Sequence, residues 1–571
     1  MPAAVSPVNI RYHDLDALRS VAMLLGIALH GLMSFVALPL PVWPAQDIHQ
    51  HDGYLFALHA IHGFRLQLFF LVSGFFTMML YRKRGLRGLV KHRTKSILLP
   101  LVVFTLILAP ILIGIWFYGV NTDKTRSDTL WTAVQSGNTK AVERHLANGA
   151  GPDQPDSVGL TALMWAALLG QVDAANILID GGADVQVADN DGYTALHNAA
   201  FMGKTKIARV LIENGADIHS KSKNGETPLS VTETDEDATQ FLAGMLQLPV
   251  DMEKLSAGRI EIAKLLKAKG ALPQDKVKEE ALGWLYVMTP GLKTIIDQLP
   301  SWAQTIALVM VVNWLLSFVP IFQHLWFLYY LMLLVAGFTM IAWIARKRNW
   351  KPIPAWFITS PLRLLWLVPL TFLPQFFMVT DYGPDTAASP IPWPPLLAYY
   401  AVFFGFGALC YGRRILENNI GRQWPVCLLL ALPTLLMGLH WYELRGGLFV
   451  TGESNDLAHL LLTNFLCALF SVLYAWLMIF GLIGLFRRFF SGENKLIRYI
   501  SDASYWLYIT HLPLIMMLQI WVKDWQWPSG VKFIGICTIC TAALLLVYEH
   551  VVRYTCIGTM LNGRKFDKRS S

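Results

Sequence analysis

Long apolar runs, separated by short polar connections, make up most of the chain. A helix that crosses a bilayer needs about 20 predominantly apolar residues. Ten stretches meet this requirement, and they lie at residues 17–38, 54–80, 97–119, 322–345, 356–379, 395–411, 424–442, 457–486, 505–522 and 531–551. The pattern therefore predicts an all-α, polytopic membrane protein of about ten transmembrane helices.

Two apolar stretches need a separate interpretation. The first follows Asp14 and Asp16 rather than a basic segment and lacks a clear small-residue cleavage site, so we expect an uncleaved span and not a signal peptide. Residues 302–320 are also long enough to span, but they adjoin the next span almost directly. We therefore interpret 280–320 as an interfacial or re-entrant segment on the outer side, and whether 302–320 crosses the membrane stays open.

A polar segment with a fixed period interrupts the apolar pattern. The motif Gly-x-Thr-Ala/Pro-Leu begins at Gly159, Gly192 and Gly225, in steps of 33 residues, and Gly149, Gly182 and Gly215 keep the same step. This period, with its Thr-Ala/Pro-Leu element and its glycine turns, resembles the ankyrin repeat. We expect a repeat array over about residues 127–272, with Thr at the start of each first helix and with turn glycines at positive φ.

The array divides the chain into three predicted parts. Residues 1–121 form a membrane part with spans 1–3, residues 122–275 the ankyrin-repeat domain, and residues 276–571 a membrane part with spans 4–10. Ankyrin arrays resemble binding platforms without catalytic residues of their own. Two roles stay equally open for this one: binding of a protein partner, or a rigid spacer.

Composition supports lipid as the solvent for much of the chain. Of the 571 residues, 54% are hydrophobic and only 15% are charged, whereas soluble domains carry about 25% charged residues. This excludes an ordinary soluble enzyme. The formal net charge of +8 raises the question of nucleic-acid binding, but the basic residues lie at the ends of the apolar runs. They are therefore interpreted as a topology signal, and no nucleic-acid partner is expected.

The positions of lysine and arginine predict the orientation. The connection Arg82–Lys95 carries seven of them, 346–351 and 487–498 carry four each, 413–422 three, and the tail from Arg553 five. The alternate connections carry none or one. Basic connections remain in the cytoplasm, so both termini are expected there. The array then lies outside, which is the periplasm if the chain spans a bacterial inner membrane.

Arg19 and His30 are ionisable residues within the first span, where such groups are costly and mark functional sites. Eleven residues separate them, which places them on one face of a helix with about 16 Å of rise between them. A cation at the cytoplasmic mouth suits an anionic donor, and a buried imidazole suits proton abstraction. The alternatives are a topology anchor for Arg19 and a helix-contact residue for His30.

Four motifs of the apolar part resemble the membrane acyltransferase 3 family. They are Asp14-Leu15-Asp16-Ala17-Leu18-Arg19 followed by His30, Phe64-Arg65-Leu66-Gln67-Leu68-Phe69-Phe70-Leu71-Val72-Ser73-Gly74, His324-Leu325-Trp326-Phe327-Leu328-Tyr329-Tyr330, and Ser504-Tyr505-Trp506-Leu507-Tyr508-Ile509-Thr510-His511. Each motif alone is weak, but four in order are specific. Within the family, the chain is most similar to the glucan-biosynthesis protein C type, which adds succinyl groups to periplasmic glucans. The ankyrin insert departs from that type.

The resemblance implies transfer of an acyl group, acetyl or succinyl, from cytoplasmic acyl-CoA to a hydroxyl of an extracytoplasmic glycan. It implies catalytic roles for His30 as general base, for Arg19 as the group that holds donor phosphates or carboxylate, and for His511. The residues implied to bind substrate are Arg65, Ser73, His324, Trp326, Tyr505 and Arg93. No bound cofactor and no metal are expected; acyl-CoA is the donor substrate, and the lipid bilayer and the glycan are the partners.

Several of these residues also have structural interpretations. Ser73 with Gly74 is typical of a small-residue helix contact, which is the favoured interpretation of Ser73. Trp326 is typical of an interfacial aromatic belt, and Arg93 of a topology charge.

Two other polar groups have no place in the implied site. Glu549 and His550 are expected to pair with Arg553 as a simple interfacial cluster. A metal site is conceivable in the first outer loop at Asp47, His49, His51 and Asp52, but a polar surface that faces the acceptor is favoured.

Two competing functions remain. One is a channel or transporter with an ankyrin domain, although paired broken helices of the transporter type are not evident. The other is a membrane scaffold with a catalytically inactive acyltransferase body. Location of the array on the cytoplasmic side would favour the channel, and unchanged acylation without His30 would favour the scaffold.

Overall fold

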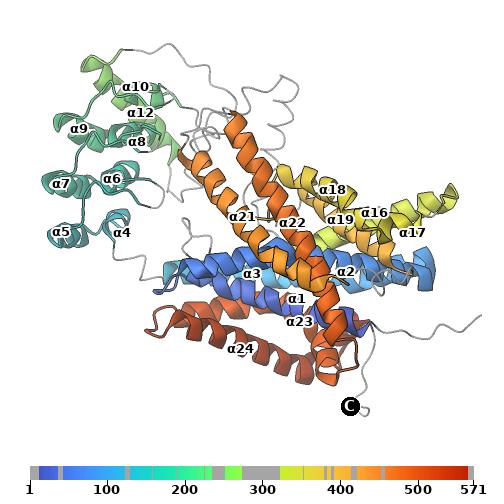
Figure 1. Ribbon diagram of the computed structural model, residues 1–571. Helices are drawn as coiled ribbons and strands as arrows, with labels where there is room; N and C mark the ends of the chain where they lie inside the picture. The colour runs from blue at the N-terminus through green and yellow to red at the C-terminus, as the bar shows by residue number, and fades with distance from the viewer. Residues whose placement is uncertain are drawn as a thin grey trace, which may run out of the picture.

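The computed structural model describes residues 12–36, 43–122, 129–156, 159–189, 191–223, 225–234, 239, 251–272, 322–351, 353–378, 382–386, 391–412, 421–451 and 457–563. These residues are mostly helical, and their one β contact is an isolated bridge between Ala188 and Thr194. The predicted all-α class is therefore confirmed (Figure 1). The expected re-entrant segment 280–320 lies outside the described residues.

Ten helices account for the ten predicted spans. They are α1 (His13–Leu32), α2 (Asp52–Arg93), α3 (Leu99–Asn121), α16 (Trp326–Lys347), α18 (Leu364–Phe376), α19 (Pro394–Cys410), α21 (Trp424–Thr451), α22 (Leu457–Phe489), α23 (Lys495–Val522) and α24 (Ser529–Val547). In the described part, seven helical segments are long and apolar enough to cross a membrane, and one of them, Asp52–Val120, contains both α2 and α3. The apolar helices α18 and α19 are shorter than a full span.

Short elements connect or extend these helices. They are η1 (Met33–Phe35), the π-helical η2 (Thr94–Leu98), η4 (Gln323–Leu325), α17 (Ala355–Thr359), η5 (Pro361–Arg363), the π-helical η6 (Tyr548–Val552) and α25 (Cys556–Asn562). Gly85 breaks α2 with φ 67° and ψ −176°, a conformation that glycine adopts without steric cost. The basic connection Arg82–Lys95 therefore lies at a bend, from which α3 returns across the bundle.

Helix α3 runs in the same direction as α23. Phe104 makes a ring contact with Trp506, and a β-carbon at Gly119 would touch Ile520. At the end of α3, the carbonyl oxygen of Thr122 lies 3.4 Å from the Nζ atom of Lys523. The array begins a few residues later, so it leaves the bundle at the end opposite Arg82–Lys95 (Figure 1).

Helices α1 and α23 also run parallel and remain in register. Arg19 contacts Ser501 and His30 contacts His511, at sequence separations of 482 and 481 residues. The predicted common face of Arg19 and His30 is thereby confirmed, because both side chains point to α23. The same pair of helices therefore extends from the basic end of the bundle toward its opposite end.

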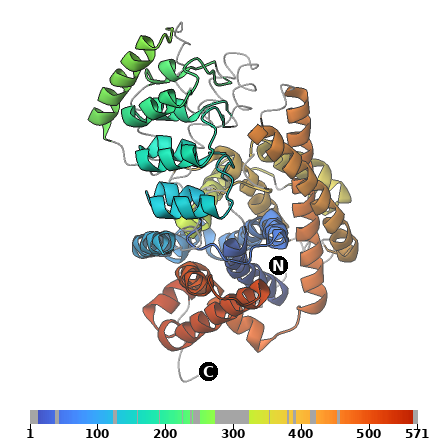
Figure 2. The same ribbon diagram turned by 90° about the vertical axis from the view of Figure 1, so that its left-hand side faces the viewer.

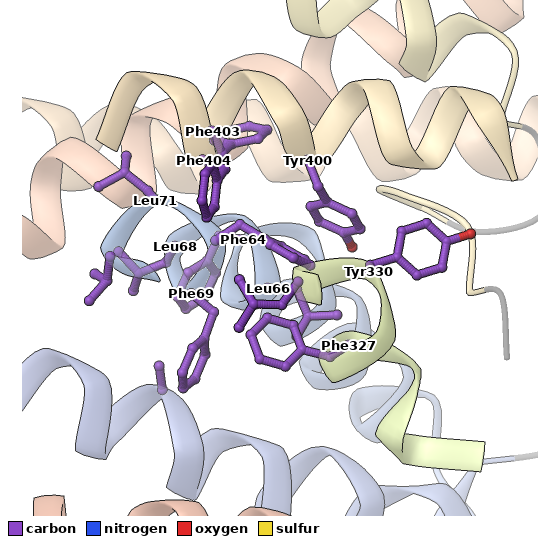
Figure 3. Packing of buried hydrophobic residues seen from close by; sticks show 14 of the residues in the cluster. Phe64, Leu66, Leu68, Phe69, Leu71, Phe327, Tyr330, Tyr400, Phe403 and Phe404 are labelled. Carbon is purple, nitrogen blue, oxygen red and sulfur yellow. The ribbon is translucent and has the colours of Figure 1, made fainter. Parts of the chain in front are cut away.

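Helix α2 packs closely on α19 through two glycines. A β-carbon at Gly74 would overlap the carbonyl oxygen of Phe404, and one at Gly407 would overlap the carbonyl oxygen of Leu71. Large aromatic and aliphatic side chains of α2, α16 and α19 fill the space on either side of this contact (Figure 3). The small-residue helix contact predicted around Gly74 is confirmed, and the neighbouring Ser73 is half-buried.

Replacement of Gly407 by alanine is expected to destabilise the protein by about 1–3 kcal/mol, because the added methyl group forces the α2 backbone away from α19. The measurement is the thermal unfolding temperature of the purified protein in detergent. Gly405→Ala, on the same helix, is the matched control, because a β-carbon there would meet nothing within 4 Å. Equal unfolding temperatures for the two variants would contradict the close contact.

The array consists of stacked helix pairs (Figure 2). Its helices are α4 (Leu130–Gln135), α5 (Thr139–Ala147), α6 (Ala162–Leu169), α7 (Val172–Asp180), α8 (Ala195–Phe201), α9 (Thr205–Glu213), α10 (Pro228–Val231) and α12 (Met252–Ala268). The expected threonines precede the first helix of each pair and form capping boxes, at Thr129, Thr161, Thr194 and Thr227. Gly149, Gly182 and Gly215 have φ values of 85°, 91° and 86°, which confirms the predicted turns.

The stretched last repeat is closed by a buried arginine. Arg259 of α12 is 4% exposed and donates hydrogen bonds to the carbonyl oxygens of Phe201 and Thr234. Its Nη2 atom also donates to the hydroxyl of Thr239. The guanidinium group thus joins α12 to the end of α8 and to the residues that follow α10.

Acidification is expected to destabilise the array through His197. Its Nδ1 atom accepts a hydrogen bond from the backbone N–H of Thr194, and its Nε2 atom donates to the carbonyl oxygen of Glu226, so the imidazole is neutral. Burial lowers the pKa of His197 below its ordinary value of 6.5. Below about pH 6.5 the unfolded chain therefore takes up a proton that the folded array does not, and stability falls as the pH falls.

Urea unfolding of a fragment of residues 122–275 between pH 7.5 and pH 5 measures this effect. The free energy of unfolding should decrease toward pH 5, and the decrease should be smaller in His197→Gln. The raised pKa of the partly buried Asp189 acts in the opposite direction, but at more acidic pH. A pH dependence that is identical in the two proteins would contradict the role of His197.

Candidate active site

Three histidines from distant parts of the sequence meet inside the bundle. The Nδ1 atom of His30, on α1, lies 2.8 Å from the Nε2 atom of His511, on α23. The ring of His324, from η4, lies 5.3 Å from that of His511 and 6.5 Å from that of His30, centroid to centroid. His511 is 1% exposed and His324 8%. All three were predicted site residues, and the structure brings them together.

The hydrogen bonds define which ring nitrogens carry protons. His511 Nδ1 lies 2.7 Å from the carbonyl oxygen of Tyr508, which only accepts, so this nitrogen is the donor. In the neutral imidazole the Nε2 atom of His511 is then an acceptor, and the Nδ1–H group of His30 donates to it. The Nε2 atom of His30 therefore carries a lone pair, as a general base requires.

His324 carries a second lone pair on a buried ring nitrogen. Its Nε2–H group donates to the carbonyl oxygen of Ile509 at 2.8 Å. Its Nδ1 atom is buried and has no hydrogen-bond partner among the described residues. The hydroxyl of Tyr508 donates to the backbone carbonyl of His324 at 2.6 Å and fixes this turn of the chain against α23.

Arg65 of α2 supplies a cation beside the histidines. Its guanidinium group lies within electrostatic range of His30 and His511. It also lies against Gly26, one helical turn before His30, where a β-carbon would overlap the Nη1 atom. In the described part of the chain no carboxylate forms an ion pair with Arg65, and its buried Nε atom has no partner. The guanidinium group is thus available to an anion in the site.

A second group of cations lies toward the N-terminal end of α1. Arg19 donates to the hydroxyl of Ser501 at 2.7 Å and lies 3.7 Å from a carboxylate oxygen of Asp16. Arg93 donates to the hydroxyl of Thr77 at 2.8 Å and is within electrostatic range of Arg19. The structure therefore unites two predicted residues, one from the first span and one from the basic connection.

Tyr505 and Ser73 lie next to this second group of cations. The buried hydroxyl of Tyr505 is in electrostatic range of Arg93 and has no hydrogen-bond partner in the described ranges. The carbonyl oxygen of Ser73 accepts a hydrogen bond from Thr77, which itself accepts from Arg93. Ser73 thus supports Arg93 through its backbone.

Trp326 packs inside the bundle. It is 6% exposed, and its ring contacts those of Tyr330 at 5.5 Å and Tyr400 at 6.1 Å. Figure 3 shows Tyr400 directed from α19 toward α16. The aromatic-belt interpretation is therefore wrong for Trp326, because a belt residue would face the lipid.

Two residues beside His30 were missed from the sequence. Gln519 of α23 donates to the carbonyl oxygens of His30 and Gly31. Trp43, in the loop that leads from η1 to α2, lies parallel to the His30 ring, with the ring centroids 6.1 Å apart. An amide within an apolar run is a detectable signal for Gln519, whereas nothing in the sequence distinguishes Trp43 from the other tryptophans.

One acidic residue of the loop between η1 and α2 has a buried structural partner. Asp47 forms an ion pair of 2.6 Å with Lys532, and both side chains are 1% exposed. Over the described ranges no three metal-ligating side chains are grouped. Near the C-terminus, Glu549 pairs with Arg553 at 2.7 Å, which confirms this part of the predicted cluster.

Comparison with known families agrees with this fold and site. The profile of the acyltransferase 3 family, described as an acyltransferase domain, matches residues 12–151 and 281–549. Ankyrin repeats, in three copies, match residues 130–242. No curated protein matches the chain significantly. The acyltransferase match covers more than half of the chain, so the protein belongs to this family of membrane acyltransferases and carries an inserted ankyrin array.

Proposed function

We propose that the protein transfers an acyl group, acetyl or succinyl, from cytoplasmic acyl-CoA to a hydroxyl of an extracytoplasmic glycan. The observation that carries this proposal is a chain of two hydrogen bonds: His30 Nδ1–H donates to His511, and His511 Nδ1–H donates to the carbonyl oxygen of Tyr508. This chain leaves a lone pair on His30 Nε2. Arg65 lies beside it and has no carboxylate partner among the described residues. The family match supports acyl transfer in general. The donor and the acceptor are our inference.

The donor is proposed to enter from the cytoplasmic end. Arg19, Arg93 and the hydroxyl of Tyr505 form a cationic group suited to the phosphates of CoA. This group lies about 16 Å along α1 from His30, as eleven residues of helix require. A donor whose phosphates and thioester are joined by an extended arm, as in CoA, reaches both positions.

The transfer step uses the residues around His30. The acceptor hydroxyl gives its proton to His30 Nε2 while its oxygen forms a bond to the thioester carbon. The Arg65 guanidinium group stabilises the oxyanion of the tetrahedral intermediate. The carbon–sulfur bond then breaks, and the proton passes from His30 to the thiolate, which leaves as CoA. His511 accepts the Nδ1–H hydrogen bond throughout, and His324 Nδ1 accepts one from the bound acceptor.

The acceptor side and the location of the array follow from orientation. If the basic connections are cytoplasmic, the array lies on the extracytoplasmic side of what we propose to be a bacterial inner membrane, with both termini inside. The exit of α3 at the end opposite Arg82–Lys95 supports this orientation. A glycan or protein bound by the array would be held on the acceptor side of the site.

Alkaline phosphatase fused within residues 150–220 is expected to be active. A fluorescent reporter that matures only in the cytoplasm, fused at the same positions, is expected to stay dark. Fusions at residue 88, in the basic connection, should give the reverse pattern. The physical reason is the excess of lysine and arginine in that connection. A cytoplasmic array would overturn the orientation and favour the channel alternative.

Mass spectrometry of cell-envelope glycans tests the function itself. Host cells that express the protein should carry ester-linked acyl groups on an extracytoplasmic glycan, and cells that express His30→Ala should not. The mass difference identifies the acyl group, and fragmentation identifies the sugar. Identical glycans in cells with and without the protein would reject the proposal and favour an inactive scaffold.

A further inference from the structure

Gln519 is a buried amide that holds the backbone of His30. It lies two helical turns beyond His511 on α23 and is 1% exposed. Its Nε2 atom donates to the carbonyl oxygens of His30 and Gly31, each at 3.0 Å. These carbonyls belong to the last turn of α1, where the regular backbone donors of the helix run out; the His30 carbonyl also accepts from the backbone N–H of Met33. Both amide hydrogens are thus used to fix the residue that carries the proposed base.

Trp43 connects this amide to the imidazole ring. Its Nε1–H group donates to the Oε1 atom of Gln519 at 2.8 Å. The planes of the indole and of the His30 imidazole differ by 1°, with centroids 6.1 Å apart, an offset stack. One side chain therefore orients the amide and limits the rotation of the imidazole ring.

The loop that carries Trp43 is itself fixed. The backbone N–H of Asp47 donates to the carbonyl oxygen of Ser34 at 2.8 Å, just after α1. The Asp47 carboxylate pairs with Lys532 of α24, and removal of either partner would leave a buried charge uncompensated. The loop segment after Trp43 is therefore held by contacts with both η1 and α24.

We infer that Gln519 and Trp43 are positioning residues for acyl transfer, which keep His30 Nδ1–H directed at His511 and His30 Nε2 directed at the acceptor hydroxyl. The inference rests on the proposed role of His30 as the base. The hydrogen bond to His511 does not by itself define the plane of the imidazole, and the two rings are tilted by 32° to each other. A displacement of about 1 Å at the reacting atoms lowers a rate by about 10²-fold.

Kinetics of the full-length protein in nanodiscs test this inference, with acetyl-CoA and a periplasmic oligosaccharide fraction as substrates. Gln519→Leu should lower kcat by about tenfold to 10²-fold, with the KM for acetyl-CoA within about twofold of its original value because the donor site is distant. Trp43→Phe keeps an aromatic ring over His30 but loses the N–H donor, so its loss should be smaller. In both variants kcat is calculated per folded protein molecule.

Gln375→Leu is the matched control for the loss of a buried glutamine. Gln375 is 2% exposed and donates to the carbonyl oxygen of Gly383 at 2.6 Å, but it does not contact His30. This variant should lose thermal stability and keep kcat. An equal loss of kcat in Gln375→Leu and Gln519→Leu would show that Gln519 acts only on stability and would overturn the inference.

Solid-state NMR of protein labelled with ¹⁵N-histidine provides a measurement that needs no acceptor. The His30 signals, identified by their absence in His30→Ala, should show one protonated and one unprotonated ring nitrogen. Gln519→Leu should mix the two tautomers of His30. Unchanged His30 signals together with an unchanged kcat would reject the positioning roles. Full activity of His30→Ala would instead reject the proposed function, and the NMR result would still decide whether Gln519 orients the ring.

Discussion

Replacement of His30 by alanine is expected to lower the rate of acyl transfer by about 10²–10⁴-fold, the usual contribution of a general base. The variant loses the Nε2 lone pair of His30. In the original protein, the hydrogen bonds of His511 place the ring proton of His30 on Nδ1 and leave Nε2 unprotonated. Without it, the acceptor hydroxyl must attack the thioester while it still holds its proton. The measurement is the initial rate of ester formation on the glycan, with the protein concentration determined separately.

Two further histidine variants make this prediction specific. His511→Asn should lose less activity, because His30 keeps its Nε2 atom and loses only the partner that defines its tautomer. His59→Asn is the matched control, since His59 is a buried histidine whose ring contacts are with Tyr382 and Tyr442 rather than with His30. It should keep its rate. Equal rates for His30→Ala and the original protein would exclude a catalytic role of the imidazole.

Much of the site was predictable because it depends on helix periodicity. Two residues eleven positions apart, such as Arg19 and His30, share a face of one helix. Two residues of the candidate site can therefore be placed before the partner helix is known. The apolar runs and the 33-residue period of the array were likewise local signals, and both are found in the structure. Local spacing therefore predicted the helices, the repeat array and the relative positions of Arg19 and His30 along α1.

The remaining geometry depends on contacts between distant segments. The positions of His324 and His511 along the chain do not indicate that their rings lie 5.3 Å apart. Trp43 is in a loop, where periodicity carries no information. Trp326 was misinterpreted because an aromatic residue at the end of an apolar run has the same local pattern whether it faces lipid or a neighbouring helix. Packing of α16 against α2 and α19 decides whether Trp326 faces lipid or a neighbouring helix.

Replacement of Arg65 by methionine is expected to lower kcat by about 10²–10³-fold, the usual cost of losing one group that stabilises an oxyanion. The methionine side chain fills similar space, so the loss should come from charge rather than from packing. Arg65→Lys should recover part of the rate, because it restores the charge but not the planar, forked group. The measurement is kcat at saturating acetyl-CoA.

Gly26 allows a test of Arg65 that leaves the arginine in place. Residue 26 lies one turn before His30, and a β-carbon there would overlap only the end of the Arg65 side chain. Gly26→Ala should therefore displace the guanidinium group without disturbing the helix packing, and kcat should fall while the unfolding temperature stays the same or rises, as alanine favours a helix over glycine. Gly337→Ala, a helical glycine whose β-carbon would meet nothing within 4 Å, should gain the same helix propensity and keep kcat. If Gly26→Ala also kept kcat, the position of the Arg65 guanidinium group would not matter, and the oxyanion would have to be stabilised by another group.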